Sequence, residues 1–220
     1  MTGADPRLVE GGPLPFLLSL PPAAPGGAPP PVLCFLHGYD EGAPMEIRRA
    51  LTRHGPLAAT SSPAARSEFI VLAPQLPVRG DAWFRHADAV EEIVREAWRL
   101  HGGDPARTYL TGFSFGGNGV FDLALLRREP WAALWPVDPT RVPRGDPGLP
   151  VWLSSGEVSR HATRAFVGSL APEPLDEHRE PGDRVHEDQG LDHVGTATRA
   201  YGDDRIYRWL LSKRRPGPAG

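Results

Sequence analysis

The stretch that decides the fold is Thr108-Tyr109-Leu110-Thr111-Gly112-Phe113-Ser114-Phe115-Gly116-Gly117. Its first four residues are typical of a buried strand, and the segment from Asn118 to Arg128 is typical of a helix, so a tight turn at Ser114 joins the two. Glycines two residues before and after the serine remove side chains that would collide in such a turn. In this context the G-x-S-x-G pattern predicts a nucleophilic serine, presented at a helix N-terminus.

Short apolar runs bounded by turn residues recur on both sides of this stretch. They do not alternate with polar residues, which favours strands that are buried on both faces. Helical patterns lie between them, the clearest at 90–101, where apolar positions recur at helical spacing. The expected strands are 32–36, 69–73, 108–111, 132–137 and 151–154, with an edge strand near 16–20, and the expected helices are about 45–54, 90–101, 117–128, 160–170 and 196–211.

Strands that alternate with helices predict an α/β fold. We expect a three-layer sandwich, in which a mostly parallel central sheet carries helices on both faces and ligands bind beyond the carboxyl ends of the strands. The segment between Val137 and Pro150 is too short for a large lid. A chain of 220 residues is expected to form one domain, over 1–213, followed by a flexible C-terminal tail over 214–220.

Composition excludes several classes of partner. The net charge is −3 and no basic stripe is interleaved with aromatic residues, so no nucleic acid partner is expected. No apolar run approaches the ~18 to 20 residues of a membrane helix, so no membrane insertion is expected. The single Cys34 lies in an apolar run, and Asp5 and Glu10 disfavour a secretion signal. We expect a cytoplasmic protein, and the sequence leaves open whether it is a monomer or a homodimer.

The expected strand at 32–36 is followed by His37-Gly38-Tyr39. A loop of this kind can direct a backbone N–H group at an oxygen that gains negative charge during a reaction, forming an oxyanion hole. The first donor is predicted to be the N–H group of Tyr39, with that of Gly38 next. The second donor is predicted to be the N–H group of Phe115, directly after the serine. His37 is interpreted as a structural residue that holds this loop.

His193 is the predicted general base. It lies in a loop between a strand-like stretch, Arg184 to Glu187, and the last expected helix, which Trp209 and Leu210 anchor to the core. In the fold expected here, the general base follows the nucleophile and comes last along the chain. A histidine at this position can take the proton of Ser114 and return it to the leaving group.

Acidic and histidine residues gather near the predicted base. Their spacing fits no zinc pattern, so we expect no metal. No cofactor motif is recognised, and no cofactor is expected. The residues concerned are His186, Glu187, Asp188, Asp192 and His193.

The order of these motifs, with further short blocks, resembles an α/β-hydrolase. The chain is most similar to the compact serine esterases of the phospholipase/carboxylesterase and dienelactone-hydrolase-like group, and to peptidase-like and polyhydroxybutyrate-depolymerase-like esterase modules. The resemblance implies hydrolysis of an ester through an acyl-enzyme on Ser114, with His193 as base. The blocks that carry it are Leu14-Pro15-Phe16-Leu17-Leu18, Phe35-Leu36-His37-Gly38, Ala73-Pro74-Gln75, Ala82-Trp83-Phe84, Asp104 to Gly112 and Thr198-Arg199-Ala200-Tyr201.

The sequence departs from these esterases at the acid that would orient His193. In them an aspartate follows the strand that corresponds to 151–154, whereas this chain carries Ser159 near that position. Glu157 is the first choice for the acid, and Asp138, which follows the preceding strand, is the alternative. Asp192, which is adjacent to the histidine, would reach its ring awkwardly and is interpreted as a solvated residue.

Substrate and activity are less well determined than the nucleophile. Trp83 and Phe84 follow a loop beyond a strand end and are candidates to line the acyl pocket. The favoured function is hydrolysis of a small-molecule carboxylic ester or thioester. The alternatives are a non-catalytic binding homologue, motivated by the missing aspartate, and a peptidase or acyltransferase that uses the same nucleophile.

Overall fold

The computed structural model describes residues 5–23, 27–176 and 178–215. Strands form one mixed sheet in the order β1-β2-β4-β3-β5-β6-β7-β9-β8. The strands are β1 (Arg7–Val9), β2 (Phe16–Ser19), β3 (Val32–Leu36), β4 (Ile70–Pro74), β5 (Thr108–Phe113), β6 (Ala133–Val137), β7 (Val151–Ser155), β8 (Glu173–Pro174) and β9 (Arg184–Asp188).

Helices fill most of the connections between these strands. They are η1 (Tyr39–Glu41), α1 (Ile47–Leu51), α2 (Ala64–Glu68), η2 (Trp83–His86), α3 (Ala87–His101), α4 (Phe115–Leu126), α5 (Glu157–Arg160), α6 (Thr163–Leu170), α7 (His193–Tyr201) and α8 (Asp204–Ser212). The segment expected as one helix at 196–211 is therefore two helices, because the chain breaks at Gly202 and the side chain of Asp203 caps α8 by accepting the N–H group of Arg205.

The sheet is mostly parallel, as the sequence predicts. Neighbouring strands from β4 through β3, β5, β6, β7 and β9 to β8 are parallel. Only β1 and β2 run antiparallel, β1 along β2 and β2 along β4. The expected edge strand at 16–20 is therefore wrong in one respect: β1, a segment the sequence analysis missed, pairs with β2 and takes the edge.

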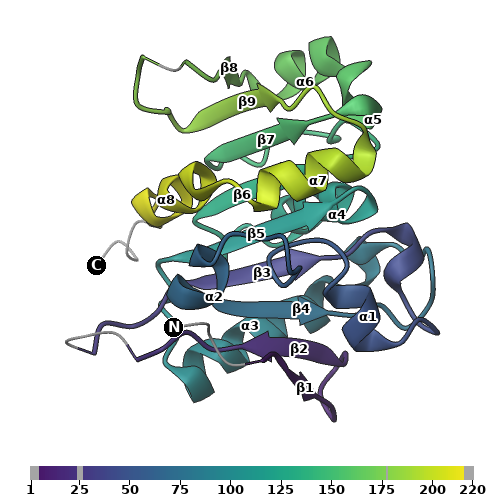
Figure 1. The fold of residues 1–220 in the computed structure, drawn as a ribbon, viewed down its shortest axis with the longest axis vertical. Coiled ribbons are helices and arrows are strands. Elements are labelled where there is room, and N and C mark those ends of the chain that lie inside the picture. Colours follow the sequence, from purple (N-terminus) through teal and green to yellow (C-terminus); the bar gives the residue numbers. More distant parts are fainter. Residues whose placement is uncertain (1–4, 24–26, 177, 216–220) are drawn as a thin grey trace.

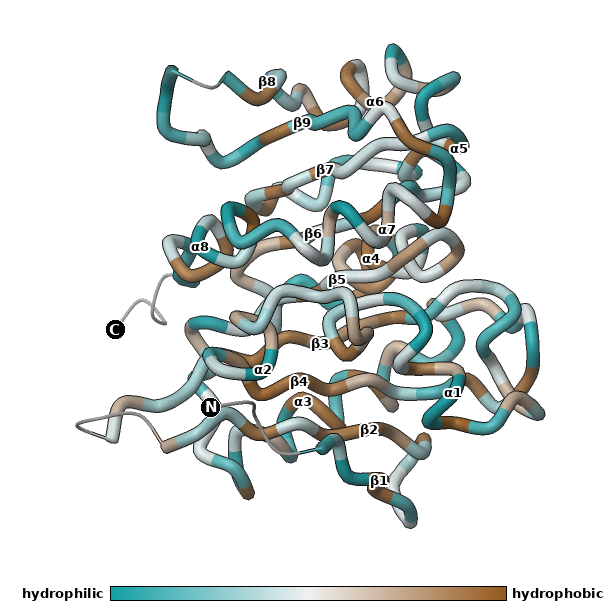
Figure 2. The backbone as a smooth tube through the Cα atoms, viewed as in Figure 1, coloured by the Kyte–Doolittle hydropathy of each residue, from teal (hydrophilic) through white to brown (hydrophobic). Residues whose placement is uncertain are grey.

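Helices cover both faces of the sheet (Figure 1). Alternate strand residues face opposite layers, so that Cys34 contributes to the core under α3, α4 and α6, and Phe35 to the core under α1, α2, α7 and α8. Figure 2 shows the hydrophobic residues running along the central strands. Full burial of each large apolar side chain stabilises the fold by about 1.5–3 kcal/mol.

Helix α3 illustrates how the sequence pattern forms a layer. Its apolar face is completely or almost completely buried, and its C-terminus is closed by Gly102 at a φ of 66°, a left-handed conformation that glycine adopts without strain. The buried residues of α3 are Ala87, Val90, Ile93, Val94 and Ala97.

The parallel strands bring their carboxyl ends to one edge of the sheet, and the loops that follow β3, β5 and β6 meet there. Residues 138–150, between β6 and β7, contain neither helix nor strand, so this segment forms no large lid over the edge. Within the described ranges, no helix has the length and apolar character needed to cross a membrane. Of the tail expected at 214–220, Arg214 pairs with Asp104 at 3.3 Å and Arg215 donates its N–H group to the Ala106 carbonyl; residues 216–220 lie outside the described residues.

Candidate active site

Ser114 occupies the sharp turn between β5 and α4. Its φ of 57° and ψ of −116° lie in a region that non-glycine residues rarely adopt, which is the strained geometry of a nucleophile turn. The turn also packs too tightly for larger neighbours, because a Cβ atom at Gly116 would collide with the Leu36 carbonyl and one at Gly112 with the backbone of Gly116. The glycines therefore have the steric role that the sequence pattern predicts.

A chain of short contacts runs from Ser114 through His193 to Asp138. The Nε2 atom of His193 lies 2.8 Å from Ser114 Oγ, and its Nδ1 atom lies 2.6 Å from Asp138 Oδ2. When His193 is neutral, the ring donates from Nδ1 to the carboxylate and accepts the serine hydroxyl at Nε2. This tautomer is the one in which the histidine can act as a base towards the serine.

His193 is placed at the start of α7. Asp192 caps this helix by accepting the N–H group of Gly195 at 2.7 Å. The carboxylate of Asp192 is thus occupied by a helix N-terminus. The imidazole of His193 packs on the ring of Phe113, with ring centroids 4.5 Å apart.

Asp138 is completely buried, with a φ of 41°, and its carboxylate is held by several donors. Its Oδ1 atom accepts the N–H group of Gly156 at 2.9 Å, and both the N–H and the hydroxyl of Ser159 at 2.8 and 2.6 Å. Burial by itself would raise the pKa of Asp138. Hydrogen bonds from His193 and Ser159 outweigh that effect, and the pKa of this carboxyl group is lowered. The group therefore stays ionised at neutral pH.

The first choice of acid, Glu157, is wrong as a partner of His193. Glu157 is the first residue of α5, its side chain is exposed, and within residues 5–23, 27–176 and 178–215 that side chain accepts no hydrogen bond. The physical reason is that α5 turns its first N–H groups towards Asp138, from the neighbouring strand β6, and its own carboxylate outwards. The alternative that the sequence left open, Asp138, is the carboxylate that contacts the base.

The loop after β3 is fixed by His37. The Nδ1 atom of His37 donates to the Gly38 carbonyl at 2.7 Å, and its Nε2 atom accepts the N–H group of Leu76 at 3.0 Å. Burial lowers the pKa of His37 to about 4, so the ring is neutral and can make both bonds. His37 therefore holds the loop, as the sequence interpretation expects.

The candidate oxyanion donors differ in what they contact. The N–H group of Gly38 is bonded to Glu41 Oε2 at 2.7 Å, so Gly38 is wrong as a donor. The N–H groups of Tyr39 and Phe115 meet no acceptor among the described residues. The rings of these two residues pack edge to face, 5.6 Å apart, and a Cβ atom at Gly38 would lie 3.7 Å from that of Ser114. The backbone N–H groups of Tyr39 and Phe115 thus both lie beside Ser114.

The two aromatic residues predicted for the acyl pocket have different environments. Trp83 is 1% exposed, its Nε1 atom donates to the His37 carbonyl at 3.1 Å, and its ring fills the space left by Gly119. It is a core residue, and its assignment to a pocket is wrong, because the loop turns its ring inwards. Phe84 is 48% exposed, so its role as a pocket residue stays a prediction.

Two residues that support the site were missed by the sequence analysis. His54 packs on Phe113, the residue whose ring also contacts His193, and the ring centroids of His54 and Phe113 lie 4.9 Å apart. Asn118 holds the loop that carries Asp138, because its Oδ1 atom accepts the N–H groups of Thr140 and Arg141 at 3.0 and 3.1 Å. An asparagine in the first turn of the helix after the serine is the one signal that could have indicated the second contact.

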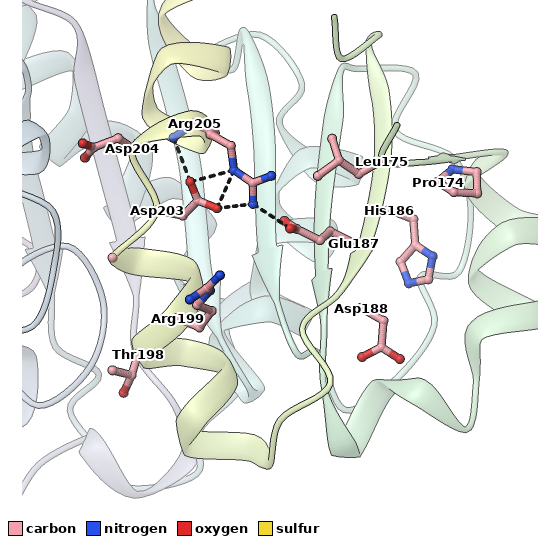
Figure 3. A pocket seen from close by; sticks show the side chains of 11 residues that line it. Pro174, Leu175, His186, Glu187, Asp188, Thr198, Arg199, Asp203, Asp204 and Arg205 are labelled. Carbon is pink, nitrogen blue, oxygen red and sulfur yellow. Dashed lines mark hydrogen bonds and ion pairs between the residues drawn. The ribbon is translucent and has the colours of Figure 1, made fainter. Parts of the chain in front are cut away.

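A polar depression of about 920 Å³ lies elsewhere, between β9 and helices α7 and α8. Figure 3 shows three of its charged residues paired with one another: Arg205 bonds both Asp203 and Glu187, the latter at 2.7 Å. Neither Ser114 nor His193 lines it. In the part of the chain that the structure describes, no group of three or more His, Cys, Asp or Glu residues is arranged to hold a metal ion.

Comparison with known proteins identifies the fold. No family model matches the sequence, and no curated protein does either. Solved structures do match. A thermostable esterase aligns with a TM-score of 0.72 at 22% identity, over 96% of this chain and 64% of its own length. The S-formylglutathione hydrolase FrmB from Staphylococcus aureus aligns with a TM-score of 0.66 at 14% identity, over 95% of this chain and all of its own length.

A third similar structure is that of a peptidase. An acylaminoacyl peptidase from Pyrococcus horikoshii aligns with a TM-score of 0.58 at 12% identity, over all of this chain and 44% of its own length. The chain thus spans less than two thirds of the length of both the thermostable esterase and this peptidase. It has the α/β-hydrolase fold of these serine hydrolases, as the resemblance in its sequence implied.

Proposed function

We propose that this chain is a serine hydrolase that cleaves carboxylic esters or thioesters of small molecules, through an acyl-enzyme on Ser114. The observation that carries the proposal is the continuous chain of contacts from Ser114 Oγ to His193 Nε2, at 2.8 Å, and from His193 Nδ1 to Asp138, at 2.6 Å. The identity of the structural neighbours supports the class of reaction and does not determine the substrate.

The first half of the reaction forms the acyl-enzyme. His193 Nε2 takes the hydroxyl proton as Ser114 Oγ attacks the carbonyl carbon, and the ionised Asp138 stabilises the imidazolium that results. The carbonyl oxygen becomes an oxyanion, for which the N–H groups of Tyr39 and Phe115 are the proposed donors. The tetrahedral intermediate then collapses, and the leaving alcohol or thiol takes the proton from His193.

The second half regenerates the enzyme. A water molecule attacks the acyl carbon and gives its proton to His193 Nε2, and the same oxyanion donors stabilise the second tetrahedral intermediate. Collapse of this intermediate breaks the bond to Ser114 Oγ, which recovers the proton from His193. A carboxylic acid leaves, and the serine is free for another cycle.

The open edge of the sheet favours small or peripheral esters. Residues 138–150 contain no helix that could cover the serine, and the side chain of His193 is 28% exposed. Leaving-group preference depends on pocket shape, so thioester cleavage, peptide cleavage and acyl transfer use the same machinery. Turnover of matched acetyl substrates with an oxygen, sulfur or anilide nitrogen leaving group separates these activities.

The observation that suggested the alternative, a non-catalytic binding homologue, no longer applies. It rested on the absence of an acid at the position of Ser159, and Asp138 now contacts His193 instead. The two readings differ in one experiment: turnover of p-nitrophenyl acetate by the wild type and by Ser114→Ala. The proposal expects turnover that the substitution abolishes. A folded wild type without turnover of any of the matched acetyl substrates contradicts it.

A further inference from the structure

Glu41 is a buried carboxylate beside the serine that the proposed reaction does not use. It ends the short helix η1, and only 3% of its surface is exposed. Its Oε2 atom accepts the Gly38 N–H group at 2.7 Å, whereas Oε1 has no hydrogen-bond partner among the described residues and lies 3.6 Å from His54 Nε2. A carboxylate removed from water at such a cost calls for a specific role.

The environment of Glu41 keeps the carboxylate poorly compensated. Burial raises its pKa to about 6, although the Gly38 N–H group and the charge of Arg53 act in the opposite direction. Burial also lowers the pKa of His54 to about 4. His54 is therefore neutral at pH 7, and its contact with Glu41 is not a pair of full charges. The bond to Gly38 is thus the main interaction that the carboxylate makes.

That bond fixes the peptide plane between His37 and Gly38. The carbonyl of this plane, on His37, accepts Trp83 Nε1 at 3.1 Å, and its N–H group, on Gly38, donates to Glu41. Both polar groups of the plane are held from opposite sides by buried side chains. The plane cannot rotate without breaking at least one of these bonds.

The next peptide plane, between Gly38 and Tyr39, is held on one side only. Its carbonyl accepts the Nδ1–H group of His37 at 2.7 Å. Because a trans peptide directs its N–H group away from its carbonyl, the N–H group of Tyr39 points away from the histidine. Of the two carbonyls and two N–H groups of these planes, the Tyr39 N–H group is the one without a hydrogen-bond partner among the described residues.

We propose that Glu41 is a positioning residue of the oxyanion hole: by holding the Gly38 N–H group it fixes the loop after β3 so that the Tyr39 N–H group, and not that of Gly38, joins the Phe115 N–H group in facing the oxyanion formed at Ser114. This inference rests on the proposed function. Gln75 supports the same arrangement, since its Nε2 atom donates to the carbonyl of Glu41 at 3.0 Å.

The test compares Glu41→Leu, Glu41→Gln and the wild type. Kinetic constants for p-nitrophenyl acetate are measured with the inhibition constant of an aryl trifluoromethyl ketone, whose adduct with the serine carries an oxyanion. Glu41→Leu is expected to lower kcat about 10²-fold, as when an oxyanion donor is lost, and to weaken the inhibitor by a similar factor with little change in KM. Glu41→Gln keeps an oxygen that accepts the Gly38 N–H group and is expected to recover most of both losses.

Asp104→Leu is the matched control. Asp104 is also a buried carboxylate that accepts a backbone N–H group, that of Ala106, but it precedes β5 and so lies at the opposite edge of the sheet. Its substitution is expected to lower stability and leave kcat and the inhibition constant near their wild-type values. If kcat and inhibitor affinity fell equally in Glu41→Leu and Asp104→Leu, destabilisation and not positioning would be responsible, and the inference would be overturned.

A second measurement needs no variant. Amide hydrogen exchange of the wild type should show the Gly38 N–H group protected in the free protein, and the Tyr39 N–H group protected only when the trifluoromethyl ketone is bound. Protection of Gly38 that appears only with the inhibitor would overturn the inference, as would a folded Glu41→Leu variant with wild-type kcat and inhibitor affinity. A wild type that neither cleaves esters nor reacts with a fluorophosphonate would instead overturn the proposed function, and this inference with it.

Discussion

Ser159 donates its hydroxyl to Oδ1 of Asp138 at 2.6 Å. The residue that stands near the acid position of the similar esterases thus supports an acid supplied by another strand. The exchange is possible because β6 and β7 are neighbours in the sheet, so that α5, after β7, meets the end of β6.

Removing this hydroxyl should weaken the base without unfolding the protein. In Ser159→Ala, Asp138 keeps its bonds to backbone N–H groups but loses an O–H donor to a charged acceptor, a bond worth about 1.5–3 kcal/mol. Because this bond helps to lower the pKa of Asp138, that pKa should rise. We expect kcat for p-nitrophenyl acetate to fall by about 10-fold or more. Ser67→Ala, at an exposed position of α2, is the control and should change nothing; an unchanged kcat in Ser159→Ala refutes the role given to its hydroxyl.

Stability should decrease in mild acid because of His37. Its pKa is 6.5 in its ordinary state and about 4 in the folded protein. The unfolded chain therefore binds a proton first as the pH falls below 6.5, and the free energy of unfolding decreases until about pH 4, by about 3 kcal/mol for this residue. His54, whose pKa is also about 4, acts in the same direction.

Glu41 opposes this effect over part of the range. Its pKa is raised from 4.5 to about 6, so the folded protein binds that proton first and gains stability as the pH falls from 6 towards 4.5. Urea unfolding at a series of pH values measures the combined effect of these groups on the free energy of unfolding. In His37→Gln, the free energy of unfolding should depend less steeply on pH between 6.5 and 4. An equal slope in the variant and the wild type would show that His37 is not the group responsible.

Trp83 and Phe84 should separate stability from substrate binding. Trp83→Ala removes a buried indole and its hydrogen bond to the loop after β3, and is expected to cost about 3–5 kcal/mol of stability. Phe84→Ala changes an exposed ring and should stay within about 0.5 kcal/mol of the wild type.

If Phe84 contacts the acyl chain, Phe84→Ala should raise KM for p-nitrophenyl butyrate by about 10-fold, and raise KM for the acetate less. Denaturation curves check the predicted stabilities of Trp83→Ala and Phe84→Ala, and KM values for the two esters check the predicted role of Phe84 in binding. Equal KM values for both esters in Phe84→Ala and the wild type would remove Phe84 from the pocket.

Much of the fold is predictable from the sequence because its signals are local. Strands buried on both faces appear as continuous apolar runs, and β3 is found within the expected bounds of 32–36. The serine turn is equally local, since its glycines avoid collisions with residues fixed by the same turn and by β3. Short elements such as β1 escaped prediction because three residues carry no period.

The identity of the acid could not be obtained in this way. It depends on which strand lies beside β7 and on where α5 directs its N–H groups, and neither is encoded in the spacing of carboxylates along the chain. The same reason applies to Gly38, whose N–H group is removed from the oxyanion hole by the reach of the Glu41 side chain. Trp83 failed as a pocket residue because an aromatic residue in a loop has no pattern that indicates which way its ring turns.

The central claim is that Ser114, His193 and Asp138 act together as one catalytic triad. The most direct measurement is the rate of modification by a fluorophosphonate, followed by intact mass and peptide mapping, in the wild type, Ser114→Ala, Asp138→Asn and Glu157→Gln. We expect one adduct on Ser114 in the wild type, none in Ser114→Ala, a rate reduced by roughly 10³- to 10⁴-fold in Asp138→Asn, and a wild-type rate in Glu157→Gln. Wild-type reactivity in Asp138→Asn, or a large loss in Glu157→Gln, would contradict the account.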